Sequence, residues 1–224
     1  MLQRAIGLGI NPERICHISG GADPEIFKVR NKHECRRRLG LLDDTPILAF
    51  SSLNSHLDLE IVFKSLVLIA QKYPSIKLIM TGQVKESIKR LAQEYCVNKY
   101  VIFTGFLPLE ELSWHLGCAD IFLLPFANTP YNIGRWPNKM GDYLCLGRPT
   151  VSNPVGDIKL LFEQHKVGCV AEWDPQDFTE KILFLLENPR ASNDFGQNAR
   201  KVALTEYNWG KITQKLGDFY YKVL

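Results

Sequence analysis

One stretch of the sequence brings two cations to the predicted beginning of a helix. The helix is expected over residues 137–146, so the backbone N–H groups at 138–140 have no helical acceptor. Arg135, Asn138 and Lys139 lie beside these groups, and the helix dipole adds positive potential there. Together they form an anion site that suits a diphosphate. The alternative interpretation makes Lys139 a solvated helix residue and Arg135 an ordinary loop cation.

Strand and helix patterns alternate along most of the 224 residues. Helical periodicities separate the apolar runs, an alternation typical of a parallel sheet with helices on both faces. Beyond about residue 175 the pattern is helical only. We therefore predict an α/β, Rossmann-like domain with a helical C-terminal extension. Its strands are expected at 46–50, 76–80, 100–103, 121–124, 149–151 and 168–170, and its last helices at 177–187, 189–206 and 209–224.

The first 45 residues are expected to hold a helix fragment, a short strand at 14–18, a turn and a basic helix. In an open parallel sheet, ligands bind at the carboxyl ends of the strands. The loops that follow the predicted strands, among them 51–56, 105–108 and 126–138, are therefore the candidate binding loops.

Composition excludes several classes of protein. The net charge of +3 gives no argument for a nucleic-acid partner, and no run of residues is apolar and long enough to span a membrane. The six cysteines are scattered and are expected to be free thiols of a cytoplasmic protein. The histidines lack metal-ligand spacing, and there is no P-loop or nucleophile elbow.

A basic cluster precedes the first main strand. It is expected to be either a solvated helix face or a surface for anionic lipid head groups, which would place the protein peripherally at the inner membrane face. The cluster consists of Lys28, Arg30, Lys32, Arg36, Arg37 and Arg38.

Several segments, in order, resemble the C-terminal domain of GT-B fold glycosyltransferases of the family-4, or group 1, type. Residues 20–27 are similar to N-G-V-D-x-x-x-F, residues 101–105 to V-x-F-x-G, and residues 119–125 to A-D-V-F-V-L-P. Residues 137–139 and 143–151 resemble P-x-K and E-Y-L-A-x-G-K-P-V-V. The resemblance covers roughly residues 14–224.

This resemblance implies one half of a GT-B enzyme. Residues 1–27 would be a leading segment and interdomain turn, and 28–224 the domain that binds a nucleotide sugar. An N-terminal acceptor domain would be supplied by the full-length protein or by a partner subunit. The nucleoside-diphosphate sugar would be the substrate, with no cofactor and no obligatory metal, and the hexosyl group would pass with retention to a glycan or lipid-linked acceptor.

The resemblance also implies roles for individual residues. Lys139, Arg135 and Asn138 would bind the diphosphate. Asp142 would accept hydrogen bonds from the ribose, although its acid also suits the first turn of a helix. Backbone groups near Phe106 and Leu107 would contact the nucleobase, unless Phe106 is a core aromatic. No residue is assigned to catalysis.

The sequence departs from the family pattern at two places. Ser52 and His56 stand where the family has an arginine and a lysine on the donor phosphates, and they are the expected substitutes. No acid lies eight residues before Asp142. The loop there is expected to enclose the sugar through Asn132, Ile133 and Gly134.

These departures keep a second hypothesis open. The leading interpretation is the donor-binding half of a glycosyltransferase. The alternative is a non-catalytic domain that has kept the fold for binding or assembly and has lost the phosphate site. A sugar-nucleotide epimerase ranks third, because its carboxylates and histidines have no counterparts here.

Overall fold

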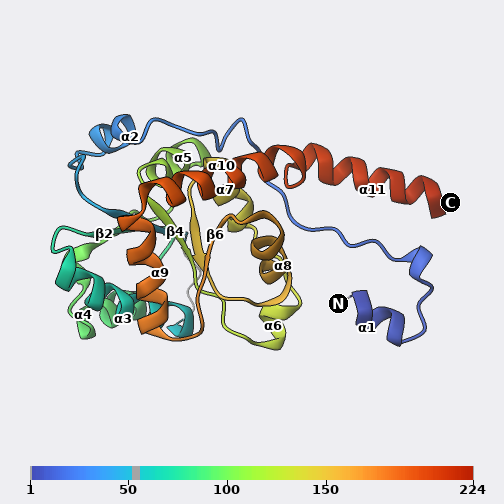
Figure 1. Ribbon diagram of the computed structural model, residues 1–224, viewed down its shortest axis with the longest axis horizontal. Coiled ribbons are helices and arrows are strands. Elements are labelled where there is room, and N and C mark those ends of the chain that lie inside the picture. The colour runs from blue at the N-terminus through green and yellow to red at the C-terminus, as the bar shows by residue number, and fades with distance from the viewer. Residues whose placement is uncertain (1, 52–55, 224) are drawn as a thin grey trace.

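A six-stranded parallel sheet forms the centre of the computed structural model, which describes residues 2–51 and 56–223 (Figure 1). The strand order is β3-β2-β1-β4-β5-β6, so the winding reverses between β1 and β4. Every strand begins and ends within one residue of its prediction, and the predicted Rossmann-like class is confirmed. The strands are β1 (Ile47–Ser51), β2 (Lys77–Thr81), β3 (Val101–Phe103), β4 (Ile121–Leu124), β5 (Thr150–Ser152) and β6 (Gly168–Val170).

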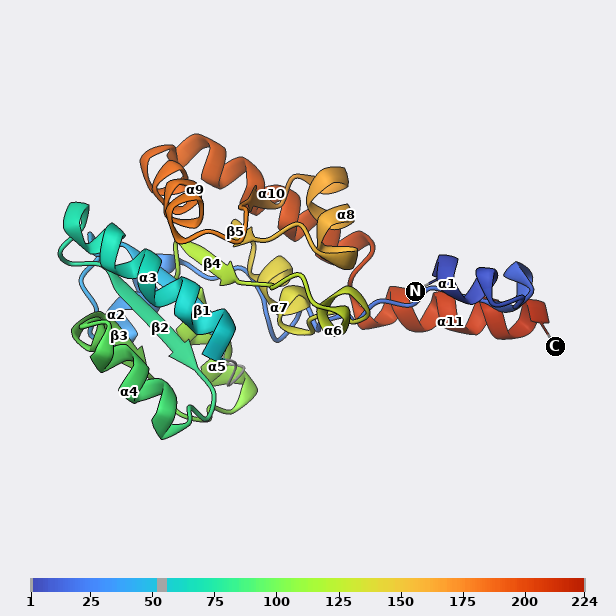
Figure 2. The same cartoon turned by 90° about the horizontal axis from the view of Figure 1, so that it is seen from below.

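Each face of the sheet is covered by its own set of helices, because successive strand residues point to opposite faces. Leu48 and Phe50 face one core, and Ala49 faces the other. Figures 1 and 2 show the two helical layers. The first core includes α3 (His56–Lys72), α4 (Glu86–Glu94) and α9 (Pro175–Glu187), and the second includes α2 (Lys32–Arg38), α5 (Leu109–Gly117), α7 (Lys139–Leu146), α8 (Gly156–His165) and α10 (Pro189–Thr205).

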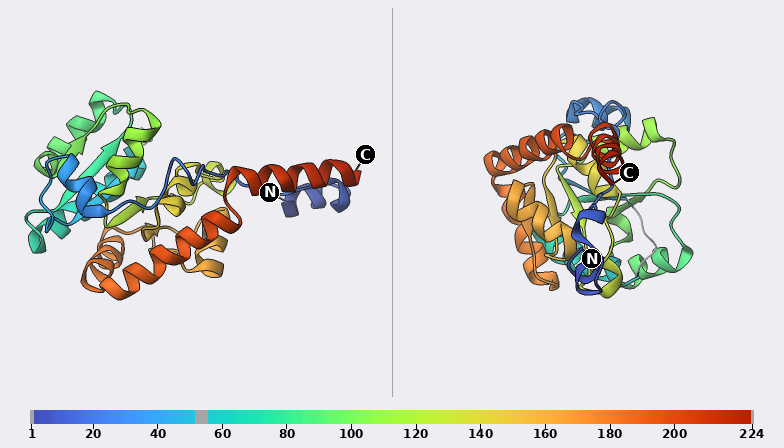
Figure 3. Two further views of the ribbon diagram at one scale, coloured as in Figure 1. Left: turned by 90° about the horizontal axis from the view of Figure 1, so that it is seen from above. Right: turned by 90° about the vertical axis from the view of Figure 1, so that its right-hand side faces the viewer.

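Both ends of the chain project from the same side of this body (Figures 1 and 3). They hold α1 (Leu2–Gly7), η1 (Pro12–Arg14) and α11 (Trp209–Val223). The strand predicted at 14–18 is wrong: this segment is not a strand and pairs with no strand among the described residues. Its β-favouring residues run past the sheet, and the chain first forms a bridge at Ala22, opposite Asn208.

Part of the basic cluster stabilises the fold. Four of its six side chains form ion pairs with carboxylates, and Arg36 is only 2% exposed. These contacts hold the N-terminal segment against α5 and the start of β4, while Lys28, Arg37 and Arg38 stay exposed. The pairs are Arg30–Glu110, Lys32–Asp120, Arg36–Asp120 and Arg38–Glu111.

No helix in the described part of the chain is both long and apolar enough to cross a bilayer. The six cysteines are free thiols, three of them fully buried: Cys35, Cys118 and Cys145.

Candidate donor site at the switch point of the sheet

The amino end of α7 lies over the carboxyl end of β1, next to the point where the strand order reverses. Lys139 donates a hydrogen bond from Nζ to the carbonyl oxygen of Ser51, and the N–H of Ser51 donates to the hydroxyl of Tyr143 at 2.8 Å. Tyr143 also stacks on Phe122 of β4 with 4.2 Å between ring centroids. The helix is thus fixed to two neighbouring strands, and Figure 2 shows it beyond the tip of β4.

The ammonium group of Lys139 is held in a poorly hydrated position. Its nitrogen lies 4.2 Å from the centre of the Phe50 ring. Burial lowers the pKa of Lys139 to about 7, with the buried carboxylate of Asp58 opposing the shift and Arg135 adding to it. A cation that is poorly compensated in the free protein favours the arrival of an anion.

Asp58 is a residue that sequence reasoning missed. It lies in the first turn of α3 and is 6% exposed. Its acid type in a first helical turn is too common to mark a site, and only the fold brings it near Lys139.

Asp142 lies one turn after Lys139 on α7. Burial alone raises the pKa of Asp142 to about 7, and its carboxylate has no hydrogen-bond partner or ion pair among the described residues. Two free acceptor oxygens in a half-buried position are what a vicinal diol requires.

The amino end of α7 offers fewer open donors than the sequence predicts. The N–H of Met140 donates to the carbonyl oxygen of Pro137 at 2.8 Å, so it is already used. The N–H groups of Asn138 and Lys139 have no acceptor in the part of the chain that the structure describes. Asn138 is exposed and its side chain caps nothing, so it is free to meet a ligand.

Arg135 is fixed in place by the loop before α7. Its guanidinium carbon lies 4.8 Å from the Phe126 ring centre and 4.7 Å from that of Tyr131. Its Nε donates to the side-chain oxygen of Asn132 at 2.9 Å. A stacked, hydrogen-bonded arginine presents its charge with little loss of entropy on binding.

The predicted sugar loop is divided by this arrangement. The side chain of Asn132 makes its hydrogen bonds within the loop. Its amide nitrogen donates to the carbonyl oxygen of Ala127 at 2.8 Å, and its side-chain oxygen accepts from Nε of Arg135. It is buried at the end of α6 (Pro130–Ile133). Only Ile133 and Gly134 of the three residues are exposed.

The turn after β3 is placed as expected for a binding loop. Phe106 is 84% exposed, so the core-aromatic interpretation is wrong, and Leu107 is half-buried beside it. Gly105 takes a φ of +70° and accepts a hydrogen bond from the N–H of Gly82, which joins the ends of β2 and β3. Ser52 lies outside the described residues. His56 begins α3, and its side chain is likewise not described.

Within the described residues, no three His, Cys, Asp or Glu side chains gather as metal ligands would. The groups that meet at this edge of the sheet are two cations, two N–H groups and a carboxylate with no partner among those residues.

Comparison with known proteins assigns the family. The model of the family described as "Glycosyl transferases group 1" matches residues 31–202. The chain belongs to this family. Curated relatives include a GDP-mannose-dependent alpha-(1-6)-phosphatidylinositol monomannoside mannosyltransferase of Mycolicibacterium smegmatis, 25% identical over 90% of the chain and 55% of the relative. A D-inositol 3-phosphate glycosyltransferase of Corynebacterium glutamicum is 22% identical over 94% of the chain and 52% of the relative.

Solved glycosyltransferases share the fold. HepE of Anabaena in complex with UDP superposes with a TM-score of 0.82 at 18% identity, over 98% of the chain and 61% of HepE. The C-terminal domain of the group 1 protein LpcC of Francisella tularensis matches over its whole length and over 84% of the chain, with a TM-score of 0.69 at 14% identity. The chain thus spans about half the length of the curated relatives that it matches.

Proposed function

We propose that this group 1 glycosyltransferase chain binds the nucleoside-diphosphate-sugar donor at the amino end of α7. The observation that carries the proposal is the position of Lys139: a half-buried ammonium over the carboxyl end of β1, at the switch point of the sheet. HepE, which has this fold, has been solved with UDP and with UDP-glucose. The mannosyltransferase relative is GDP-mannose-dependent by name, so a nucleoside diphosphate is the shared chemistry.

Each described group has a role in this proposal. Lys139 and Arg135 bind the diphosphate together with the N–H groups at 138–139. Asp142 accepts from the ribose hydroxyls, and backbone groups at Phe106 and Leu107 contact the base. Ile133 and Gly134 border the sugar. Ser52 and His56 remain candidate phosphate ligands from the sequence alone.

The same groups would assist transfer. When the bond between the sugar and the diphosphate breaks, negative charge grows on the leaving diphosphate. Two fixed cations and two N–H groups stabilise that charge more strongly than they stabilise the bound donor. We infer that the chain is the donor half of a retaining hexosyltransferase with a glycan or lipid-linked acceptor. The acceptor would be bound by a further domain of the full-length protein or by a partner subunit.

A titration with UDP, GDP, ADP and their sugar conjugates tests the proposal. Calorimetry is expected to show one nucleoside diphosphate that binds with micromolar to millimolar affinity and raises the melting temperature. The control variant Lys159→Ala replaces an exposed lysine of α8 and is expected to bind the nucleotide as tightly as the wild type does. If no nucleotide binds to the chain or to the full-length protein, the non-catalytic interpretation takes its place.

Donor binding is also expected to be linked to proton uptake. Because the pKa of Lys139 is about 7, the amine is largely neutral at about pH 8, and an arriving diphosphate favours its charged form. Asp142, with a pKa of about 7, is largely ionised there before and after binding. Calorimetry at about pH 8 in two buffers of different ionisation enthalpy should report uptake of up to about one proton per nucleotide sugar. An absence of uptake would contradict the role given to Lys139.

A further inference from the structure

A groove lies at the opposite edge of the sheet, where β4 and β5 begin. It consists of two cavities of about 340 and 460 Å³ that share Gly147, Arg148 and Asn193. Asp120 and Lys32 border the first cavity, and Lys201 borders the second. None of these residues belongs to the donor site. The donor site is at the amino end of α7, and the groove is at its carboxyl end, beside Gly147.

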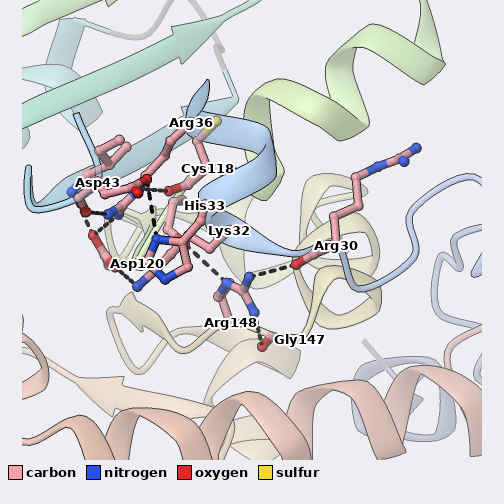
Figure 4. A network of polar contacts seen from close by, with 11 residues as sticks. Arg30, Lys32, His33, Arg36, Asp43, Cys118, Asp120, Gly147 and Arg148 are labelled. Atoms are coloured by element: carbon pink, nitrogen blue, oxygen red, sulfur yellow. Dashed lines mark hydrogen bonds and ion pairs between the residues drawn. The ribbon is translucent and has the colours of Figure 1, made fainter. Parts of the chain in front are cut away.

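The groove contains more positive than negative charge. Asp120 accepts from Lys32 Nζ at 2.5 Å and from Arg36 at 2.6 Å, and its Oδ2 also accepts from the N–H of Ile47 at 2.8 Å. Figure 4 shows this network with Arg148 beside it. One carboxylate therefore already serves two cations and a backbone donor.

Arg148 adds a third cation, which interacts with Asp120 through its charge but forms no ion pair among the described residues. Within the described chain its guanidinium donates only to backbone carbonyls, at 3.1 Å to Ala119 and 3.2 Å to Arg30, with a longer contact of 3.5 Å to Gly147 (Figure 4). Burial lowers the pKa of Arg148 below its ordinary value. Three cations (Lys32, Arg36 and Arg148) thus share the single carboxylate of Asp120, which leaves an excess of about two positive charges. Cations in protein interiors are normally matched by anions.

The second cavity increases the imbalance. Arg200 donates to the carbonyls of Pro24, Phe27 and Cys145, and neither it nor Lys201 forms an ion pair among the described residues. Asp120 is the one carboxylate among the described residues that line either cavity.

The amino end of α10 contributes to the same potential. Pro189, Ser192 and Asn193 from its first turns border the first cavity. The N-cap residue Asn188 makes no side-chain capping bond, so the N–H groups of Arg190 and Ala191 lack a side-chain acceptor. The dipole of this 17-residue helix adds positive potential to that of the side chains.

We propose that this groove is a second anion site, which binds the phosphate group of a phosphomonoester through Lys32, Arg148 and the amino end of α10. A phosphomonoester carries nearly two negative charges at neutral pH, which matches the excess in the cluster. The cavities are larger than a phosphate ion, so the group is either part of a free phosphorylated compound or a lipid head group. The proposal does not depend on the donor site.

Asn193→Asp tests it. Asn193 is exposed, and an acid in the first turns of α10 suits the helix dipole, so the variant should fold and keep its melting temperature. The added carboxylate cancels part of the positive excess. Gln214→Glu, an exposed site on α11, makes the same amide-to-acid change outside the groove. All proteins carry Lys139→Met, which weakens phosphate binding at the donor site, and any binding that remains there is the same in both variants.

Inorganic phosphate and vesicles of phosphatidic acid in phosphatidylcholine are the two probes. Asn193→Asp should weaken binding of one or both by at least tenfold, and Gln214→Glu should not. Phosphate binding identifies a free compound, and vesicle binding alone identifies a lipid head group. If neither probe binds, or if both variants bind equally, the groove is not a phosphate site. Nucleotide titrations of Asn193→Asp with Lys139 restored should be normal, which separates this outcome from failure of the donor site.

Discussion

Lys139→Met is expected to weaken binding of the nucleoside diphosphate by about 10- to 150-fold, equivalent to about 1.5–3 kcal/mol for a charged hydrogen bond. The loss should fall on the diphosphate and not on the base, so the preference among nucleosides should be unchanged. Methionine fills similar volume and removes the ammonium group together with its hydrogen bond to the Ser51 carbonyl. Calorimetric titration against wild type measures the change, and Lys159→Met is the matched control.

The same substitution should leave the free protein at least as stable as wild type. Because the folded-state pKa of Lys139 is about 7 and its ordinary value is 10.5, the unfolded chain binds the proton more tightly. The charged amine therefore costs stability fully below about pH 7, and the cost disappears as the pH rises to about 10.5. In thermal melts, the stability that Lys139→Met gains over wild type should therefore be largest below about pH 7 and should disappear as the pH rises to about 10.5. Unchanged affinity in the variant would refute the binding role, and a loss of stability at pH 7 would contradict the cost assigned to the charged amine.

Asp120→Asn is expected to destabilise the protein by about 3–5 kcal/mol, because it leaves the buried guanidinium of Arg36 without its carboxylate. Arg36 is 3% exposed at its side chain and pairs with no other carboxylate in the described part of the chain. The same carboxylate accepts from Ile47 at the start of β1, so its loss also loosens the central strand. Urea unfolding measures the difference in free energy.

Glu110→Gln is the matched control for this prediction. Glu110 pairs with Arg30, but its side chain is 73% exposed, so the pair contributes at most about 1 kcal/mol. If the two variants unfold at the same urea concentration, the buried Asp120 network contributes no more stability than the exposed Arg30–Glu110 pair.

Local sequence was sufficient to predict the strands of the sheet and the helix before β5. The strands are continuous apolar runs because both faces of a parallel sheet are buried, and runs of that kind can be read without knowing their neighbours. Pro137 and Gly147 marked the ends of the helix before β5 for equally local reasons, although α7 itself begins at Lys139. The segment at 14–18 shows the limit: its residues favour an extended chain, but pairing depends on a sheet edge that the segment does not reach.

The site was determined in part by residue type and in part by tertiary structure. The sequence alone placed Arg135, Lys139 and Asp142 together, since they lie within two turns of one helix start. It did not indicate that Asn132 and two aromatic rings hold Arg135, that Asp58 approaches Lys139, or that the charges of Lys139 and Asp142 are shifted towards neutrality. A pKa depends on the water and charges around a group, and those are contributed by β1, α3 and the loop after β4, which only folding brings to the same place.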